Sequence, residues 1–201
     1  MPDSTPSQTN PSTWLCHPLT PERWTDFERL FGPRGAYGGC WCMWWRTTRA
    51  EFESQQGEGN RRAMEAIVKA GEVPGILLYG DGEPVGWCSV APRENFASLN
   101  RSRVLKPIDD TPVWSIVCFY VAKGYRNQGV LHRLIDGAVD WVRENGGNVV
   151  EAYPSVPKSG RMPPVSSFMG APEAFLRSGF VEVKRASTAK MIMRKELDKA
   201  G

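Results

Sequence analysis

The sequence has neither a long apolar run nor a marked excess of charge. No stretch approaches about 18 uninterrupted apolar residues, the length that a membrane-spanning helix needs. The 25 Lys and Arg residues against 22 Asp and Glu residues leave a formal net charge of +3, which is too small to indicate binding to nucleic acid or to an anionic membrane. Internal repeats are also absent from the sequence. We therefore expect a soluble protein without nucleic-acid or membrane partners.

The N-terminus lacks the features of a targeting segment. Residues 1–11 are rich in Ser, Thr, Pro and Asn, with no apolar run and no basic start, which argues against a signal peptide or an anchor. We expect these residues to form a disordered tail. Residues 12–201 are numerous enough to bury a sizeable core, and we expect a single domain there. The expected location is the cytoplasm.

The cysteines do not follow the spacing of a structural metal site. They are odd in number, and two of them lie in strand-like apolar runs, so reduced and mostly buried thiols are expected. Cys40 and Cys42 form C-x-C, whereas structural zinc sites use C-x-x-C, and no second pair follows. No metal is therefore predicted. An alternative, a redox or metal protein built on Cys16, Cys40 and Cys42, stays open at this point.

Hydrophobic periodicity predicts alternating strands and helices. After Gly129, apolar residues recur at the three-to-four spacing of one helix face, and Gly146 and Gly147 end that helix. Between 74 and 91, two strand-like runs flank a Gly-Asp-Gly turn, which predicts a hairpin. The fold class is α/β or α+β, with a mixed sheet. The remaining predicted elements are strands over 14–18, 113–121, 148–153, 180–184 and 190–194, and helices over 21–31, 59–70 and 172–178.

The segment 113–147 carries the clearest functional signal. It is predicted to run from a buried strand through a short loop into an amphipathic helix. The first turn of a helix has backbone N–H groups without intrahelical partners, and it is the positive end of the helix dipole. Gly129 allows a close approach of the backbone to a ligand. The sequence therefore predicts that the N–H groups of residues 127–131 hold a phosphorylated ligand.

The loop sequence and the order of elements resemble the GNAT superfamily of CoA-dependent N-acyltransferases. The family signature is Arg or Gln, two residues, Gly, one residue, and Gly or Ala, and RNQGVL at 126–131 fits it except for Leu131. Gly179 and Phe180 match a second landmark near the end of the family's domain. The resemblance covers roughly residues 14–195. It implies a mostly antiparallel central sheet flanked by helices and splayed between the strands 113–121 and 148–153.

The resemblance also implies a cofactor and an activity. Acetyl-CoA is the expected co-substrate, and no metal takes part. The expected reaction is transfer of acetyl to a primary amine of a small molecule or peptide by direct attack in a ternary complex. The alternative is a catalytically weak or inactive acyl-CoA-binding or regulatory module, and a homodimer is compatible with either function. The residues expected to bind the cofactor are Phe119, Tyr120, Val121, Arg126, Asn127, Gln128, Gly129, Val130 and Leu131.

The family's usual acid and base are missing. Ser115 stands where one branch has a glutamate base, and Phe175 stands where many branches have a tyrosine acid. Glu151 and Tyr153 lie on the strand that flanks the expected cleft and share a face, so they are the predicted catalytic residues.

Glu151 and Tyr153 also fit purely structural roles. Glu151 fits a strand carboxylate paired with a neighbouring base, and Tyr153 fits a wall residue. Ser166 and Ser167, in the following loop, are further candidates for the chemistry. No acid is required if the thiolate leaves unassisted. Arg93, before the central strand, is interpreted as solvated surface, with a place facing the cleft or the outer phosphate of CoA as the alternative, and it is given no role.

The segment 37–48, YGGCWCMWWRTT, has the most unusual composition of the chain. In the resembling family the region after the first helix contributes to the acceptor pocket. Trp41, Trp44 and Trp45 are therefore predicted to form an aromatic wall, and Arg46 to bind an acceptor carboxylate or phosphate. Tryptophans packed in the core are the alternative.

Overall fold

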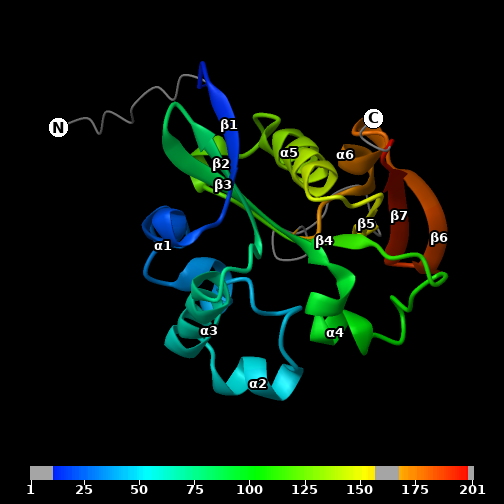
Figure 1. Cartoon of the computed structure of the whole chain (residues 1–201), viewed down its shortest axis with the longest axis horizontal. Helices are drawn as coiled ribbons and strands as arrows, with labels where there is room; N and C mark the ends of the chain where they lie inside the picture. The colour runs from blue at the N-terminus through cyan, green and yellow to red at the C-terminus, as the bar shows by residue number, and fades with distance from the viewer. Residues whose placement is uncertain (1–10, 157–167, 199–201) are drawn as a thin grey trace.

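A computed structural model describes residues 11–156 and 168–198 of the chain. These residues form a seven-stranded sheet in the order β1-β2-β3-β4-β5-β7-β6, with helices on both faces (Figure 1). Neighbouring strands are antiparallel except for the parallel pair β4–β5. The predicted mixed, mostly antiparallel sheet is therefore confirmed. The strands are β1 (Trp14–Pro18), β2 (Gly75–Gly80), β3 (Glu83–Pro92), β4 (Trp114–Val121), β5 (Val149–Ala152), β6 (Val181–Ser187) and β7 (Lys190–Glu196).

The helices agree with the periodicity of the sequence, except for two short ones that the periodicity does not predict. The sequence predicts the positions of α1, α3, α5 and α6, whereas α2 and α4 are not predicted. No helix in the described ranges is long and apolar enough to cross a membrane. Residues 1–10 of the predicted tail lie outside these ranges. The helices are α1 (Trp24–Phe31), α2 (Arg49–Ser54), α3 (Glu58–Lys69), α4 (Ala97–Asn100), α5 (Val130–Glu144) and α6 (Pro172–Arg177).

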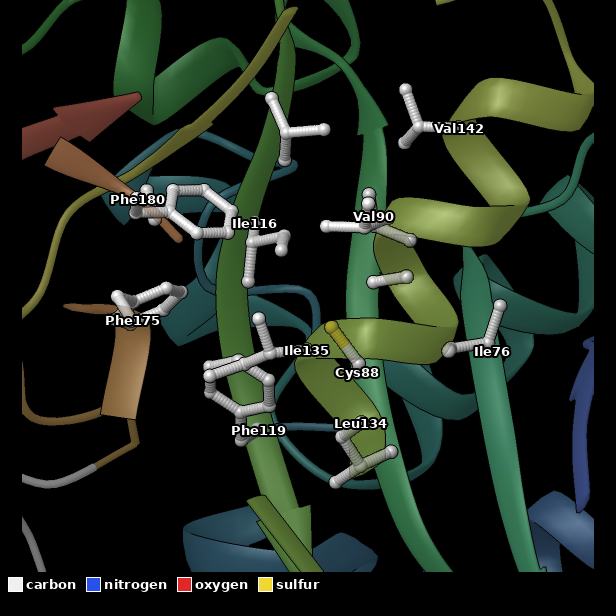
Figure 2. Close-up of a cluster of buried hydrophobic side chains, with 14 of the residues drawn as sticks. Ile76, Cys88, Val90, Ile116, Phe119, Leu134, Ile135, Val142, Phe175 and Phe180 are labelled. Carbon is white, nitrogen blue, oxygen red and sulfur yellow. The ribbon is translucent and has the colours of Figure 1, made fainter. Parts of the chain in front are cut away.

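The main core lies between α5 and the sheet. Leu134 and Ile135 of α5 point toward Cys88 of β3 and Phe119 of β4 in Figure 2. Phe175 of α6 closes the far end of this cluster, where its ring centre lies 6.0 Å from that of Phe119. The apolar stripe of α5 is therefore what holds its N-terminus at the end of β4. The opposite face of the sheet is covered by α1, α3 and the segment between α1 and α2.

The parallel pair β4–β5 is short and then opens. Its register runs only from Trp114 opposite Val150 to Ile116 opposite Ala152. On its other edge β4 has a bulge, because Ile116 and Cys118 pair with consecutive residues of β3 and leave one extra residue between them. A bulge bends its strand and increases the local twist. The predicted splay between the two strands is thus confirmed, and it begins after Ile116.

Candidate active site

The loop between β4 and α5 is fixed by local contacts. After the 3₁₀ turn Lys123–Tyr125, the side-chain amide of Gln128 donates to the carbonyl of Gly124 at 2.9 Å. Nε of Arg126 donates to the carbonyl of Val121 at 3.1 Å, which ties the loop to the end of β4. Gly129 has φ 74°, a left-handed conformation that favours glycine. The loop therefore reaches α5 in one defined path.

The start of α5 has free backbone donors. In the described part of the chain, the N–H groups of residues 127–131 make no hydrogen bond. No side chain caps this end of the helix, and its first turn contains no acidic residue. Asn127, with φ 63°, is exposed at the same place. These donors and the helix dipole together form a site for an anion.

The gap between β4 and β5 is partly filled by the chain itself. The N–H of Phe119 donates to the carbonyl of Phe168 at 2.6 Å, and the N–H of Ser155 donates to the carbonyl of Gly170 at 3.2 Å. The segment 168–170 therefore bridges the two diverging strands, with Met169 buried between them. The N–H of Phe119, one of the residues expected to bind the cofactor, is therefore already bonded within the chain.

Tyr120 and Val121, the other two residues of β4 that are expected to bind the cofactor, have different surroundings from Phe119. Tyr120 pairs with Trp87 of β3, and its ring packs on Phe31 with centres 5.3 Å apart. The N–H of Ala122 donates to Val85 of β3 at 2.9 Å. Because successive N–H groups of a strand alternate between its edges, the N–H of Val121 points away from β3 and toward the gap. Val121 is therefore the strand residue best placed to meet a ligand there.

Glu151 lies in a buried hydrogen-bond network at the root of the gap. Its carboxylate accepts from Arg93 Nη1 at 3.0 Å, from Arg194 Nε at 2.7 Å and from the hydroxyl of Tyr153 at 2.6 Å. Neither Glu151 nor Tyr153 is exposed to solvent. The hydroxyl of Tyr153 also contacts Ser115 Oγ at 2.8 Å. The structure thus brings the two predicted catalytic residues together and surrounds them with protein groups.

The electrostatics of this network keep Tyr153 neutral. Burial, together with the adjacent charge of Glu151, raises the pKa of Tyr153 above its ordinary value. The pKa of Arg194 is also raised, first by its hydrogen bonds to Asp109 and then by those to Glu151. Nη1 and Nη2 of Arg194 lie 2.7 and 3.1 Å from the two carboxylate oxygens of Asp109. Tyr153 is therefore a hydrogen-bond donor to a carboxylate that two arginines already hold.

Arg93 is the member of the network that the sequence does not reveal. The expectation of a solvated surface residue is wrong, because Arg93 is buried and also donates through Nη2 to the carbonyl of Leu105 at 2.6 Å. Its main partner, Glu151, is 58 residues away, and no local pattern marks such a pair. Only the sheet order brings the two together.

The two positions of the missing acid and base have structural roles. Ser115 is buried against Tyr153, and Phe175 is a fully buried core residue that also packs against Phe180 (Figure 2). Ser166 and Ser167 lie outside the described residues.

The predicted aromatic wall does not form. Trp41 is 5% exposed and stacks against Phe31 of α1 with ring centres 5.7 Å apart, so it belongs to the core. Trp44 is 41% exposed and meets Phe52 of α2 edge to face. Trp45 packs against a third cluster, which contains Tyr153. The three side chains therefore lie in different surroundings: one in the core, one at the surface and one against the third cluster.

Arg46 lies at the edge of a surface pocket with a volume of about 470 Å³. The guanidinium of Arg46 is stacked over the ring of Phe96, 4.8 Å from its centre. Burial lowers the pKa of Arg46 to about 10. The pocket is lined by Met43, Arg46, Ile67, Glu72 and Asn95.

The three cysteines Cys16, Cys40 and Cys42 do not assemble into a redox or metal centre. Cys16 on β1 lies on the α5 side of the sheet, with its thiol 3.6 Å from the carbonyl of Arg133. Cys42 lies on the opposite side, where it accepts from Trp87 Nε1 at 3.0 Å, and Cys40 packs on that same side. The alternative of a centre built on all three is therefore wrong. Within the described ranges, no three side chains of His, Cys, Asp or Glu are grouped to hold a metal ion.

Comparison with known proteins places this architecture in a family. The model of the acetyltransferase (GNAT) family matches residues 41–159, more than half of the chain. No curated protein matches the sequence.

Several solved structures share the fold at low identity. The NatC complex bound to Gag peptide and CoA has a chain that is 11% identical, with a TM-score of 0.52 over 92% of this chain and 99% of that one. The PaiA N-acetyltransferase from Thermoplasma acidophilum in complex with coenzyme A is 13% identical, with a TM-score of 0.51 over 92% and 99%. A GNAT-family acetyltransferase from Streptococcus agalactiae is 10% identical, with a TM-score of 0.56 over 94% and 98%. With the family match, the splayed β4–β5 pair and the open start of α5, the chain belongs to the GNAT acetyltransferase family.

Proposed function

We propose that the protein is an N-acetyltransferase that moves acetyl from acetyl-CoA to a primary amine of a small molecule or peptide. The observation that carries the proposal is the set of unpartnered N–H groups at residues 127–131, at the mouth of the gap between β4 and β5. Two solved structures with this fold contain CoA or coenzyme A according to their descriptions. The family membership and the anion site both support acetyl-CoA as the acetyl donor.

The donor is proposed to bind through its pyrophosphate and its pantetheine arm. The pyrophosphate would accept from the N–H groups of Asn127, Gln128, Gly129, Val130 and Leu131, with the exposed guanidinium of Arg126 beside them. The arm would follow β4 from Val121 toward Phe119 and pass Tyr120. Because the N–H of Phe119 is bonded to Phe168, the arm reaches Phe119 only after that bond opens.

The proposed chemistry is direct attack of the amine on the thioester. The nitrogen forms a bond to the carbonyl carbon, the C–S bond breaks, and the electron pair leaves on the CoA thiolate. The ammonium gives up one proton to water before the attack, and the nitrogen gives up a second proton to water or to the departing thiolate as the amide forms. The thiolate is a good leaving group. We propose that Glu151 and Tyr153 are positioning residues, because both are buried among protein partners at the root of the gap. The alternative, that they act on the reacting atoms, stays a prediction.

The test is CoA release from acetyl-CoA over a library of amines, with Asn127→Asp as the diagnostic variant. The new carboxylate lies where the pyrophosphate is proposed to bind, so the KM for acetyl-CoA should rise about threefold to tenfold at low ionic strength and less at high salt. Asn127→Gly is the matched control, because it keeps the positive φ without adding charge. Equal KM values for the two variants would contradict this placement of the donor.

The second candidate is an acyl-CoA-binding module without turnover. It is favoured by the segment 168–170, which closes the gap at Phe119, and by the missing acid and base at Ser115 and Phe175. CoA binding by calorimetry, with no CoA release for any amine, would support this candidate over the enzyme.

A further inference from the structure

Lys190 carries a half-buried amine without an opposite charge beside it. It is the first residue of β7, and its Nζ donates to Ser155 Oγ at 2.7 Å and to Met169 Sδ at 2.9 Å. Neither partner is charged, and a thioether is only a weak acceptor. Among the described residues, no carboxylate lies within 4.0 Å of this Nζ. The surroundings therefore hold the amine without compensating a positive charge.

These surroundings favour the neutral form of the amine. Burial disfavours an ammonium without a counter-charge, because its lost hydration is not replaced. Burial accordingly lowers the pKa of Lys190 to about 8. At pH 7.5 about a quarter of such amines are neutral, a fraction more than 100-fold above that of a lysine with an ordinary pKa. Only the neutral amine has the electron pair that attacks a carbonyl carbon, so Lys190 has the character of a nucleophile.

The amine lies beside the segment that closes the gap between β4 and β5. Met169 is buried there, and the carbonyl of the preceding Phe168 accepts from the N–H of Phe119 at 2.6 Å. The N–H of Ser155 donates to the same segment at 3.2 Å, so both partners of the amine belong to this closure. If the pantetheine arm takes the N–H of Phe119, the carbonyl of Phe168 has to leave, and the adjacent Met169 moves with it. The amine, on its flexible four-carbon stem, then faces the space that the arm has entered.

The face of β7 distinguishes Lys190 from the other lysine of the strand. Side chains alternate along a strand, so Lys190 shares its face with Ile192, which lies in the same buried cluster as Met169. Lys195 is also half-buried but points to the opposite face, where its Nζ donates to the carbonyl of Ser178 at 2.7 Å. Lys195 is therefore a matched lysine that does not face the closing segment.

We propose that Lys190 is a self-acetylation site, which accepts the acetyl group of the acetyl-CoA bound to its own chain. Nζ forms a bond to the carbonyl carbon, the C–S bond breaks, and the electron pair leaves on the CoA thiolate. The nitrogen gives up one proton to water or to the thiolate as the amide forms. The product is a neutral amide, so the modification also removes the uncompensated charge. This inference rests on the proposed transfer function.

The test is peptide mass spectrometry of the full chain after incubation with acetyl-CoA and no added amine. Acetylated Lys190 should accumulate at a rate that saturates with acetyl-CoA and does not change when the protein is diluted, because donor and acceptor belong to one complex. Acetylation of Lys195 in the same sample is the internal reference. Lys190 should react at least about 10-fold faster than Lys195, which is a modest share of the advantage that proximity gives.

Two variants complete the experiment. Lys190→Arg keeps the charge but accepts no acetyl group, so the modification should disappear while CoA binding and the melting temperature show that the chain is folded. Lys195→Arg is the matched control and should keep the modification at Lys190.

Three results would overturn the inference. They are acetylation of Lys190 no faster than that of Lys195, a rate that falls on dilution, and a rate that rises linearly with acetyl-CoA without saturation. The first and the third indicate chemical acetylation from solution, and the second indicates transfer between molecules. If added amines are acetylated while Lys190 stays unmodified, this inference is wrong and the transfer function stands. If acetyl reaches neither Lys190 nor any added amine, both are wrong.

Discussion

Glu151→Gln is expected to destabilise the protein strongly, because the wild-type carboxylate compensates two arginines. It accepts three hydrogen bonds of 2.6–3.0 Å, from Arg93, Tyr153 and Arg194, and it has no access to water. A glutamine keeps the shape but has no charge, and its NH₂ group would face a guanidinium donor. Removing one partner of a buried ion pair costs about 3–5 kcal/mol. For a domain of this size we expect the melting temperature to fall by roughly 6–20 °C.

The assay is urea unfolding together with thermal melting, with Glu182→Gln as the matched control. Glu182 pairs with Arg185 at the surface, so that substitution should change the free energy of unfolding by less than about 1 kcal/mol. If Glu151→Gln has the stability of the wild type but loses turnover, Glu151 acts in the chemistry and the positioning role is wrong. If neither stability nor turnover changes, the reasoning from burial and pairing is refuted.

The remaining predictions concern acid stability, the core and the thiols. The hydrogen bonds from Arg194 lower the pKa of Asp109 to about 2, so the stabilisation is present above about pH 4 and is lost as the pH falls through 2. Asp109→Asn should therefore lower the melting temperature at pH 7 and much less at pH 2. Trp41→Ala should cost about 3–5 kcal/mol in urea unfolding, and Trp44→Ala less than about 2, because only Trp41 is buried; equal costs would contradict the core assignment. Burial raises the pKa of Cys16 to about 11, so its alkylation at pH 7.5 should be slow in the native protein and fast in denaturant; rapid native labelling of Cys16 would contradict its packing against α5.

Local patterns predict the elements but not the contacts that join distant segments. The apolar spacing along α5 and the turn at Asp81 with Gly82 are local signals, and the structure has a helix and a hairpin there. The partner of Glu151 cannot be found in this way, because Arg93 approaches it only through the order of the strands.

The segment around Trp41 shows a second limit of prediction from the sequence. Its composition predicts an aromatic surface, but composition does not tell which side chain of a tight loop turns inward. The left-handed φ of Trp41, 44°, directs that ring into the core against Phe31. The carbonyl of Phe168, which binds the N–H of Phe119, likewise comes from a stretch with no periodic signal.

The most direct test of the proposed donor site is a crystal structure of the protein with CoA. The account predicts pyrophosphate oxygens within hydrogen-bond distance of the N–H groups of residues 127–131, and the pantetheine arm along β4 with the bond between Phe119 and Phe168 open. CoA bound elsewhere, or an arm outside the gap between β4 and β5, would contradict it.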